Sequence, residues 1–467
     1  MSDPILIVGS YAESEPIGGN RTLALQAFSL SRLGERIEVL TWPHNDTWRG
    51  ARPDGASKLA GLPYVCVERA NVPFHVVECP PIWAERSLTE MEWETAVAWA
   101  MRALEQLQPR LVHHQFWQNL WWFLEAAQRL GIPTVYSAHD YGMACPRTIL
   151  VNGWDELCTV KASVDVCSRC IVAGRNPLGK ANELVARLPF TRTLLAAAFG
   201  TDGKGPLGRA GGVRLPVRER VGLALTRCRR VLGKARAIIV ASPFAREFFF
   251  SQFVEDADRI HVLPWFHGQS RVLETLPRGD GVLRLAIATR ISPDKGMHVL
   301  LEGLSRVKSR RPVTLKIAGI YDSDYAADLV RRYRNRAGDH TVTWAGWQSN
   351  DSMYDFYSDV DAAVIPSLWY DNTPLALVEA LAHGRPVVCT DVPSMTHLVH
   401  HEVNGLVFPM GDAGALARQI ERLADTPGLV VRLARATRNV KDATEYAQEL
   451  RAIYTGIVGV SAPAVAA

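Results

Sequence analysis

The sequence contains no long uncharged hydrophobic run. No apolar stretch of about 18 residues is free of charges, so we expect no membrane-spanning helix. The N-terminal segment MSDPILIVGSYAES has no basic region before its short apolar run, which predicts a first β-strand rather than a signal peptide. The sequence also lacks a large excess of charge of one sign, because it has 52 Lys and Arg and 48 Asp and Glu. This near balance does not indicate a nucleic-acid partner. Together these absences predict a cytoplasmic protein.

A dinucleotide-binding fingerprint is also missing. The turn after the first predicted strand contains Gly18 and Gly19 but no G-x-G-x-x-G, which argues against a dinucleotide-dependent oxidoreductase. What the 467-residue chain does have is ordinary globular composition, 48% hydrophobic and 21% charged. That composition supplies enough apolar material for two hydrophobic cores.

Predicted strands alternate with helical stretches through both halves of the chain. This alternation predicts parallel sheets with helices on both faces. The clearest strands of the second half are predicted at Leu283–Thr289, Thr314–Ala318, Val342–Ala345, Ala362–Pro366, Pro386–Thr390 and Gly405–Phe408. A stretch rich in Gly, Pro and polar residues at 263–281 marks the domain boundary. We therefore predict an α/β protein with two doubly wound, Rossmann-like domains facing each other across a cleft, at 1–270 and 271–440, followed by a helix and tail at 441–467.

The segment LAIATRISPDKGMHVLLEGL joins a predicted strand to a predicted helix. Ligands of doubly wound sheets bind at the carboxyl ends of strands, where this segment places Arg290. Ser292 is suited to cap the helix and Pro293 to occupy its first position, so we expect Lys295 in the first turn. Two cations beside unpaired backbone N–H groups suit a diphosphate, although either residue taken alone could be a solvated surface charge.

The segment PSLWYDNTPLALVEALAHGRPVV forms a second connection from strand to helix. Thr373 and Pro374 predict a helix start that offers the N–H of Leu375 to a phosphate. Asp371 precedes this helix and Glu379 lies inside it, so the two acids could reach hydroxyl groups at different ends of one ligand. In the alternative, Asp371 only caps the helix and Glu379 faces solvent. However, an unpaired carboxylate buried in the apolar stretch LALVEALAHG would be costly.

These segments resemble family 4 of the retaining glycosyltransferases, which have the GT-B fold. The family pattern has two glutamates eight positions apart, in the form E-x-x-P-x-x-x-x-E-A-x-A-x-G-x-P, and the first glutamate is preceded by PS and by W or Y. The chain matches it at Pro366, Ser367, Trp369, Pro374, Glu379, Ala380, Gly384 and Pro386. It departs at the first acid, which is Asp371 where the family has a glutamate. The resemblance is strong over 283–424 and looser in the N-terminal half. Because Asp is one methylene shorter than Glu, it puts the donor geometry or the turnover rate in question, but not the fold.

The resemblance implies a role for each residue of the C-terminal half. Arg290 and Lys295 would bind the diphosphate of a nucleotide-sugar donor, and Glu379 would bind its ribose. Asp371 would contact the transferred sugar near its 3-hydroxyl and support the transition state. Three further residues complete the predicted donor-binding set: Asn372, Thr373 and Leu375.

The resemblance also implies two contributions from the N-terminal half. His139 follows the predicted strand Thr134–Ala138, ahead of an aromatic residue and CPR, and it would face the 6-hydroxyl of the donor sugar as a catalytic residue. Gly19 would lie in a glycine-rich loop that closes toward the donor phosphates. From the sequence alone, a lone His is more often structural, and Gly18–Gly19 could be a simple turn.

A cysteine-rich insertion interrupts the alternation at 145–170. Its four cysteines are Cys145, Cys158, Cys167 and Cys170, and the last two form the knuckle CSRC. Four thiolates would complete the coordination shell of a structural zinc, and many members of the resembled family carry a similar insertion. Free thiols or an iron–sulfur cluster are the alternatives.

A basic segment follows at 187–236, with twelve Lys and Arg opposed by Asp202 and Glu219. Arginines interleaved with apolar residues suit a helix lying on an anionic membrane surface, so we predict possible peripheral contact with the inner face of a membrane. A solvated helical face is the alternative. Membrane contact would imply a lipid-linked acceptor.

We therefore expect a retaining glycosyltransferase of the hexosyltransferase type. It would transfer a sugar from a UDP- or GDP-sugar to a glycan or lipid-linked acceptor, in bacterial polysaccharide or glycoconjugate synthesis. None of the Asp-x-Asp pairs in the sequence indicates a metal that chelates the donor, so we expect catalysis to require no cofactor. One alternative is a non-catalytic partner subunit that keeps the GT-B fold. The aspartate at position 371, where the family has a glutamate, favours this alternative. The other is a UDP-sugar epimerase.

Overall fold

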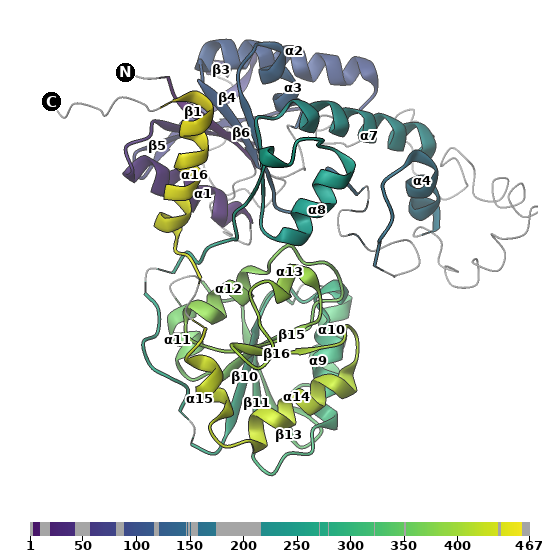
Figure 1. The fold of residues 1–467 in the computed structure, drawn as a ribbon, viewed down its shortest axis with the longest axis vertical. Helices are drawn as coiled ribbons and strands as arrows, with labels where there is room; N and C mark the ends of the chain where they lie inside the picture. The colour runs from purple at the N-terminus through teal and green to yellow at the C-terminus, as the bar shows by residue number, and fades with distance from the viewer. Residues whose placement is uncertain are drawn as a thin grey trace, which may run out of the picture. The chain divides into compact units, whose positions relative to one another are not determined.

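The computed structural model divides the chain into two compact units. The first contains 1–240, 245–262 and 447–467, and the second contains 241–244 and 263–446. The described residues are 3–9, 19–42, 57–80, 88–115, 121–145, 147, 150, 157–173, 216–269, 271–278, 280–321, 323–349, 352–437 and 440–459. Figure 1 shows that each unit is built around a sheet with helices beside it.

The first unit contains a nine-stranded sheet with the strand order β3-β4-β5-β2-β1-β6-β7-β8-β9. Its strands are β1 (Ile5–Val8), β2 (Ile37–Thr41), β3 (Lys58–Leu59), β4 (Leu62–Arg69), β5 (Val72–Val77), β6 (Leu111–Gln115), β7 (Thr134–Ala138), β8 (Ala237–Val240) and β9 (Ile260–Val262). The pairs among β5, β2, β1, β6, β7, β8 and β9 are parallel, whereas β4 is antiparallel to β5 and to β3. Every residue of β1, β6, β7 and β8 is buried, as expected for strands covered on both faces.

Helices accompany these strands along the chain. They are α1 (Gly19–Arg32), α2 (Glu90–Leu107), α3 (Trp122–Arg129), α4 (Val164–Ala173), α7 (Val217–Lys234), α8 (Pro243–Gln252) and, after the second unit, α16 (Ala443–Val458). The last of these belongs mostly to the first unit. Arg451 of α16 donates to the buried Glu35 at 2.8 Å, and the Tyr454 hydroxyl lies 2.5 Å from His113 Nδ1. These two contacts hold the C-terminal helix against the first sheet.

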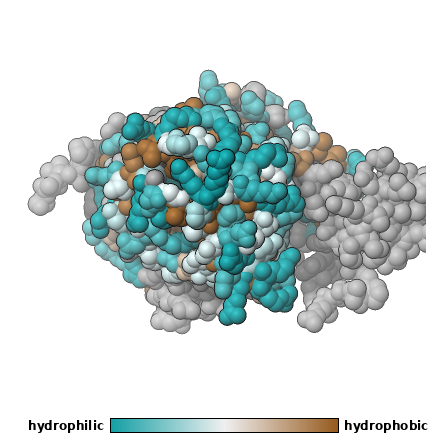
Figure 2. Space-filling model, turned by 90° about the horizontal axis from the view of Figure 1, so that it is seen from below, coloured by the Kyte–Doolittle hydropathy of each residue, from teal (hydrophilic) through white to brown (hydrophobic). Residues whose placement is uncertain are grey.

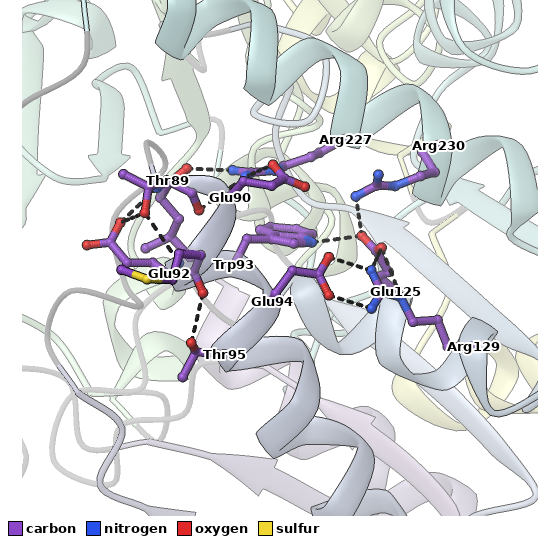
Figure 3. A network of polar contacts seen from close by, with 12 residues as sticks. Thr89, Glu90, Glu92, Trp93, Glu94, Thr95, Glu125, Arg129, Arg227 and Arg230 are labelled. Carbon is purple, nitrogen blue, oxygen red and sulfur yellow. Dashed lines mark hydrogen bonds and ion pairs between the residues drawn. The ribbon is translucent and has the colours of Figure 1, made fainter.

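A polar network joins α2, α3 and α7 on one side of the first sheet (Figures 1 and 3). Its centre is Glu125 of α3, which is only 5% exposed. Its carboxylate accepts hydrogen bonds from the Trp93 indole at 2.9 Å, from Arg129 and, at 2.6 Å, from Arg230 of α7. A buried carboxylate with three donors carries little desolvation penalty, and it links the three helices in a defined arrangement.

Arg227 of α7 extends the network to the start of α2 (Figure 3). Its guanidinium is 1% exposed, lies 4.5 Å from the centroid of the Trp93 ring, and donates to the carbonyl of Leu88 at 2.8 Å. It also donates to the carboxylate of Glu90 at 2.7 Å. Arg227 therefore points into the protein rather than toward a membrane.

Arg227→Ala is expected to lower the free energy of unfolding by about 3 kcal/mol, because it leaves a buried carbonyl unpaired and removes packing on Trp93. Urea unfolding measures this. The matched control is Arg218→Ala on the same helix, whose ion pair with Asp165 is exposed on both sides and is expected to contribute under about 1 kcal/mol. Equal losses in the two variants would contradict the structural role given to Arg227.

The second unit contains a seven-stranded sheet with the order β12-β13-β11-β10-β14-β15-β16. Its strands are β10 (Leu283–Ala288), β11 (Val313–Ala318), β12 (Arg336–Ala337), β13 (His340–Gly346), β14 (Ala362–Ile365), β15 (Val387–Thr390) and β16 (Gly405–Phe408). All of its pairs are parallel except that of the short β12 with β13. The helices are α9 (Met297–Arg306), α10 (Asp324–Arg332), α11 (Met353–Ser358), α12 (Leu375–Ala382), α13 (Pro393–Thr396), α14 (Ala413–Asp425) and α15 (Leu429–Ala434).

Two parallel-rich α/β sheets agree with the predicted pair of Rossmann-like folds. The predicted boundary lay at residue 270, whereas the compact units separate after residue 262. No helix among the described residues is long and apolar enough to cross a membrane. Residues 174–215, which include most of the basic segment, and parts of the cysteine-rich insertion lie outside the described residues.

The face of the molecule in Figure 2 is mainly hydrophilic, with its apolar residues in small separate groups. Large apolar side chains that are exposed in the second unit, such as Trp347 and Val403, are few. Small scattered apolar groups are normal on a protein surface. This face therefore gives no indication of an apolar docking surface.

Candidate functional site

The first predicted donor segment follows β10. After β10 ends at Ala288, residues Pro293–Lys295 form a short 3-10 turn, and α9 begins only at Met297. Ser292 and Pro293 are the N-cap and the first residue of this turn, as predicted, although the Ser292 side chain makes no capping bond. The prediction that Lys295 lies in the first turn of the long helix is wrong, because that helix starts two residues later. The cause is Gly296, which adopts a left-handed conformation with φ +68° and separates the turn from the helix.

The second predicted donor segment lies directly against the first. β10 and β14 are neighbouring parallel strands, so their carboxyl ends meet at one edge of the sheet. The N–H of Leu368 donates to the carbonyl of Asp294 at 2.8 Å. A Cβ atom on Gly296 would stand 1.9 Å from the carbonyl oxygen of Pro366, so only glycine permits this approach. The structure therefore brings Lys295 and the Asp371 loop together.

Lys295 and Asp371 form an ion pair at this strand edge. The ammonium donates to Oδ2 of Asp371, and the Ser367 hydroxyl donates to the same oxygen at 3.1 Å. The Lys295 ammonium also lies 5.1 Å from the centroid of the Trp369 ring. The Asp371 side chain is 9% exposed and that of Lys295 is 18% exposed. The two charges are thus largely removed from solvent and oriented by two further side chains.

Arg290 differs from Lys295 in its surroundings. Its side chain is 65% exposed, and among the described residues it makes one long polar contact, to Asp294 at 3.5 Å. A long exposed arginine at a strand end can adjust its position toward an incoming anion at little cost. The structure therefore places a fixed cation, Lys295, and an adaptable one, Arg290, on the same connection.

Helix α12 begins at Leu375, one residue later than predicted. Pro374 is its N-cap residue and makes no side-chain capping bond. Thr373 is not the cap: it has φ +56°, and its hydroxyl donates to the carbonyl of Ser394 at 3.3 Å. The carbonyl of the preceding Asn372 accepts from the Trp265 indole at 3.0 Å. Because Pro374 has no N–H, the first N–H groups at this helix end are those of Leu375 and Ala376.

Glu379 lies on α12 and is only 9% exposed, so the prediction that it does not simply face solvent is confirmed. Its Oε1 accepts a hydrogen bond from the Gln269 amide at 3.3 Å. Burial, followed by the nearby Glu379 carboxylate, raises the pKa of Tyr357 well above its ordinary value. The Gln269 contact was not predicted from sequence, because Gln269 lies 110 residues away in an irregular segment.

The described residues of that irregular segment, Gln269 and 271–278, are hydrogen-bonded at several points to residues around α12. The N–H of Leu273 donates to His383 Nδ1 at 3.2 Å, and Arg385 donates to the carbonyl of Thr275 at 2.9 Å. Because an N–H donates to Nδ1, the neutral His383 ring carries its proton on Nε2. The segment predicted only as a domain boundary therefore also supports the helix that carries Glu379.

His383 makes stability depend on pH. Burial, with smaller contributions from Arg385 and His267, lowers its pKa to about 4, against about 6.5 in the unfolded chain. Below pH 6.5 the unfolded state binds the extra proton, so stability falls as pH falls. Between pH 7.5 and 5.0 we expect His383 to account for a loss of about 2 kcal/mol. Urea unfolding of His383→Gln should show this pH dependence reduced, and an unchanged pH dependence in this variant would contradict the assignment.

His139 and Gly19 lie in the first unit. Gly19 is the first residue of α1, and His139 immediately follows β7. Nε2 of His139 lies 3.2 Å from Oε1 of Gln115. Burial, and next the neighbouring His114, lower the pKa of His139 to about 3, so the imidazole is neutral at physiological pH. This protonation state agrees with a hydrogen-bonding group rather than a charged one.

The four cysteines of the insertion lie close enough to influence one another electrostatically. Cys167 and Cys170 are on α4, and the N–H of Cys158 donates to the carbonyl of Leu150 at 2.6 Å. Burial raises the pKa of Cys167 to about 11, and the thiols of the other three add to this. Nevertheless, within the described part of the chain, no three His, Cys, Asp or Glu side chains are placed so that they could hold a metal ion. The zinc site stays a prediction.

Family models cover most of the chain. Residues 18–265 match the model described as "Glycosyl transferase 4-like domain", and residues 283–426 match "Glycosyl transferases group 1". The first match alone spans more than half of the 467 residues. The match to 283–426 lies within the second unit, and the match to 18–265 falls on the first unit apart from 241–244 and 263–265.

Curated relatives are similar over parts of their length. The chain is 34% identical over 122 residues to an uncharacterized glycosyltransferase of Methanocaldococcus jannaschii, covering 26% of this chain and 30% of that protein. It is 28% identical over 173 residues to the amylovoran biosynthesis glycosyltransferase AmsK of Erwinia amylovora, covering 36% and 42%. The chain thus spans less than half the length of these two relatives.

Solved structures are similar over the whole chain. Sucrose-phosphate synthase from Thermosynechococcus elongatus has a TM-score of 0.62 at 17% identity, covering 98% of this chain and all of that one. HepE from Anabaena, solved with UDP-glucose, has a TM-score of 0.60 at 16% identity, covering 97% and 100%. At these identities the likeness establishes the fold, which is GT-B as predicted.

Proposed function

The chain belongs to the glycosyltransferases with a 4-like domain, and from this premise we propose that it transfers a sugar from a nucleotide-diphosphate donor with retention of configuration. One observation carries the proposal: Lys295, Asp371 and the start of α12 meet at the carboxyl ends of two adjacent strands, β10 and β14. This is where doubly wound sheets bind their ligands. HepE, a structure of the same fold, was solved with UDP-glucose, which supports the choice of donor.

The leaving group would be held by positive charge and backbone dipoles. Lys295 and Arg290 would neutralise the diphosphate as charge develops on it, and the N–H groups of Leu375 and Ala376 would add the positive end of a helix dipole. Lys295 is already paired with Asp371, so the incoming diphosphate would share or replace that partner. The ion pair keeps the ammonium extended toward the site before the donor arrives.

The two buried acids, Glu379 and Asp371, would bind hydroxyl groups of the donor rather than its phosphates. Glu379 has one oxygen bonded by Gln269, and its carboxylate would accept from the donor ribose. Asp371, held by Ser367, would accept from the transferred sugar. His139, in the other unit, would contact the 6-hydroxyl of that sugar. An oxocarbenium-like transition state on the sugar ring would benefit from the negative charge of Asp371.

A second candidate function is that of a non-catalytic subunit. It is suggested by the ion pair between Lys295 and Asp371, in which each charge is already neutralised by the other rather than by a donor. A thermal-shift screen of UDP-, GDP- and dTDP-sugars followed by a transfer assay separates the two. An enzyme is expected to be stabilised by one class of donor and then to release nucleoside diphosphate and a product of unchanged anomeric configuration. Donor binding without any turnover would favour the subunit.

The acceptor is proposed to be a glycan or a lipid-linked saccharide, in polysaccharide or glycoconjugate synthesis. AmsK of Erwinia amylovora is named for amylovoran biosynthesis, which supports this class. Peripheral membrane contact stays a prediction from the basic segment 187–236. Within its described part, Arg227 and Arg230 of α7 are used for internal hydrogen bonds, and Arg229 donates to the carbonyl of Ala162.

We also propose a structural zinc at the cysteine-rich insertion, remote from the chemistry of transfer. Its ligands would be the thiols of Cys145, Cys158, Cys167 and Cys170, drawn closer together than the structure places them. Elemental analysis of purified protein should find about one zinc per chain. The double variant Cys167→Ser/Cys170→Ser should lose it, whereas Cys389→Ser, a buried free thiol of the second unit, should retain it. Metal-free wild-type protein would contradict the proposal.

A further inference from the structure

Two buried glutamines connect helix α1 to His139. Gln115 is the last residue of β6, and its Nε2 donates to Oε1 of Gln26, on α1, at 2.6 Å. Its own Oε1 lies 3.2 Å from Nε2 of His139. Because an amide oxygen can only accept, the imidazole must donate, and the neutral ring therefore carries its proton on Nε2. The chain of hydrogen bonds thus selects one of the two tautomers of His139.

Packing alone does not account for these glutamines. Gln26 and Gln115 are both 0% exposed, and an amide in such a place is costly unless it is hydrogen-bonded. The Nε2 of Gln26 has no hydrogen-bond partner among the described residues, so the pair is kept at the expense of one unsatisfied donor. Apolar side chains of similar size would fill the same volume without that penalty. A specific requirement for amides at these positions is therefore indicated.

The surroundings of His139 keep its ring neutral. His113 and His114 of β6 are near enough to interact electrostatically with His139, and a positive charge on either would repel an imidazolium. The adjacent carboxylate, Asp140, accepts from the N–H of Gly142 at 2.7 Å. A direct hydrogen-bond partner of the ring is the uncharged amide of Gln115. A carboxylate in that place would favour the imidazolium instead, as acidic partners of histidine do.

We propose that Gln115, oriented by Gln26, is a positioning residue that presents His139 to the donor sugar in its neutral, Nε2-protonated form. This inference rests on the proposed function, which alone gives His139 a reaction to serve. The reason is electrostatic. Positive charge develops on the sugar ring as its bond to the diphosphate breaks, so an imidazolium beside it would oppose the transition state. An amide partner fixes the ring without supplying a charge that would protonate it.

Gln115→Glu tests the proposal, because it replaces the amide by a carboxylate of the same shape. The histidines of the full-length chain are labelled with ¹⁵N, and the His139 signals are assigned by their loss in His139→Gln. In the wild type we expect the Nε2–H tautomer and no titration of His139 between pH 5 and 8. In Gln115→Glu we expect titration within this range, with kcat falling at least tenfold below the new midpoint and recovering above it.

Gln115→Met, paired with Gln128→Met as its control, separates positioning from stability. Gln128 donates to Thr134, at the opposite end of β7 from His139, and to the carbonyl of Val231. Both variants should lose stability, but only Gln115→Met should lower kcat by about tenfold and permit both tautomers. An Nδ1–H tautomer in the wild type, an unchanged His139 titration in Gln115→Glu, or equal kcat in the two Met variants would overturn the proposal. A wild-type chain that turns over no donor would instead refute the proposed function, while the NMR titration still decides the tautomer.

Discussion

Lys295→Ala is expected to lower kcat/KM for sugar transfer by about 10²- to 10³-fold. Loss of one preoriented group that stabilises developing charge typically costs this much. The Lys295 ammonium is fixed by Asp371 and by the ring of Trp369, whereas the exposed Arg290 on the same connection is not held in place beforehand. Steady-state kinetics with the donor found in the thermal-shift screen measure the effect.

The control is Lys316→Ala. Lys316 closely matches Lys295, since it donates to Asp359 at 2.7 Å and its ammonium lies 5.3 Å from the centroid of the Phe356 ring. It is also in the same unit, but on β11, away from the meeting point of β10 and β14. Its loss should change stability only, and kcat/KM by less than about twofold. A comparable loss of transfer in both variants would mean that Lys295 acts through folding rather than through the diphosphate.

Glu379→Ala is expected to raise the donor KM by about 10- to 100-fold. A hydrogen bond to a charged group contributes about 1.5–3 kcal/mol, which corresponds to this range. If Glu379 binds the ribose, the wild type should prefer a ribonucleotide over its 2′-deoxy analogue, and the variant should lose most of that preference. Calorimetric titration with UDP and 2′-deoxy-UDP, or the matching pair for another base, measures it.

Asp361→Asn provides the control for Glu379→Ala. Asp361 is another buried acid of the second unit, and it precedes β14 at the end opposite to Asp371. It accepts from the backbone N–H groups of Arg284 at 2.9 Å and Arg278 at 3.3 Å. Its substitution should reduce stability without changing nucleotide discrimination. An unchanged preference in Glu379→Ala would remove Glu379 from the ribose.

Six of the seven strands of the second unit could be predicted within one or two residues, because parallel strands inside a covered sheet leave apolar runs, whereas the two-residue β12 was missed. In the first unit, the antiparallel pair β4–β5 escaped prediction. β4 is half-exposed and contains Pro63, so its pattern does not resemble a buried strand. Helix α2 was also missed, although the spacing of Thr89 and Glu92 in the sequence is that of a capping box, which the structure forms.

The candidate site could be located from sequence, but its internal contacts could not. Strand ends pointed to Lys295, Asp371 and Glu379, because topology determines which ends of parallel strands meet. Their partners lie far away in sequence or depend on details of the backbone. Gln269 comes from an irregular segment, and the separation of Lys295 from α9 depends on the left-handed Gly296. No periodic pattern carries such information.

A crystal structure of the chain with its preferred nucleoside diphosphate would test the central claim most directly. We predict the terminal phosphate within about 3 Å of Lys295 Nζ and of the N–H groups at the start of α12, with the Lys295–Asp371 pair opened or shared. The ribose should lie against Glu379. A nucleotide bound elsewhere, with that ion pair intact and Glu379 still contacting only protein groups, would contradict the account.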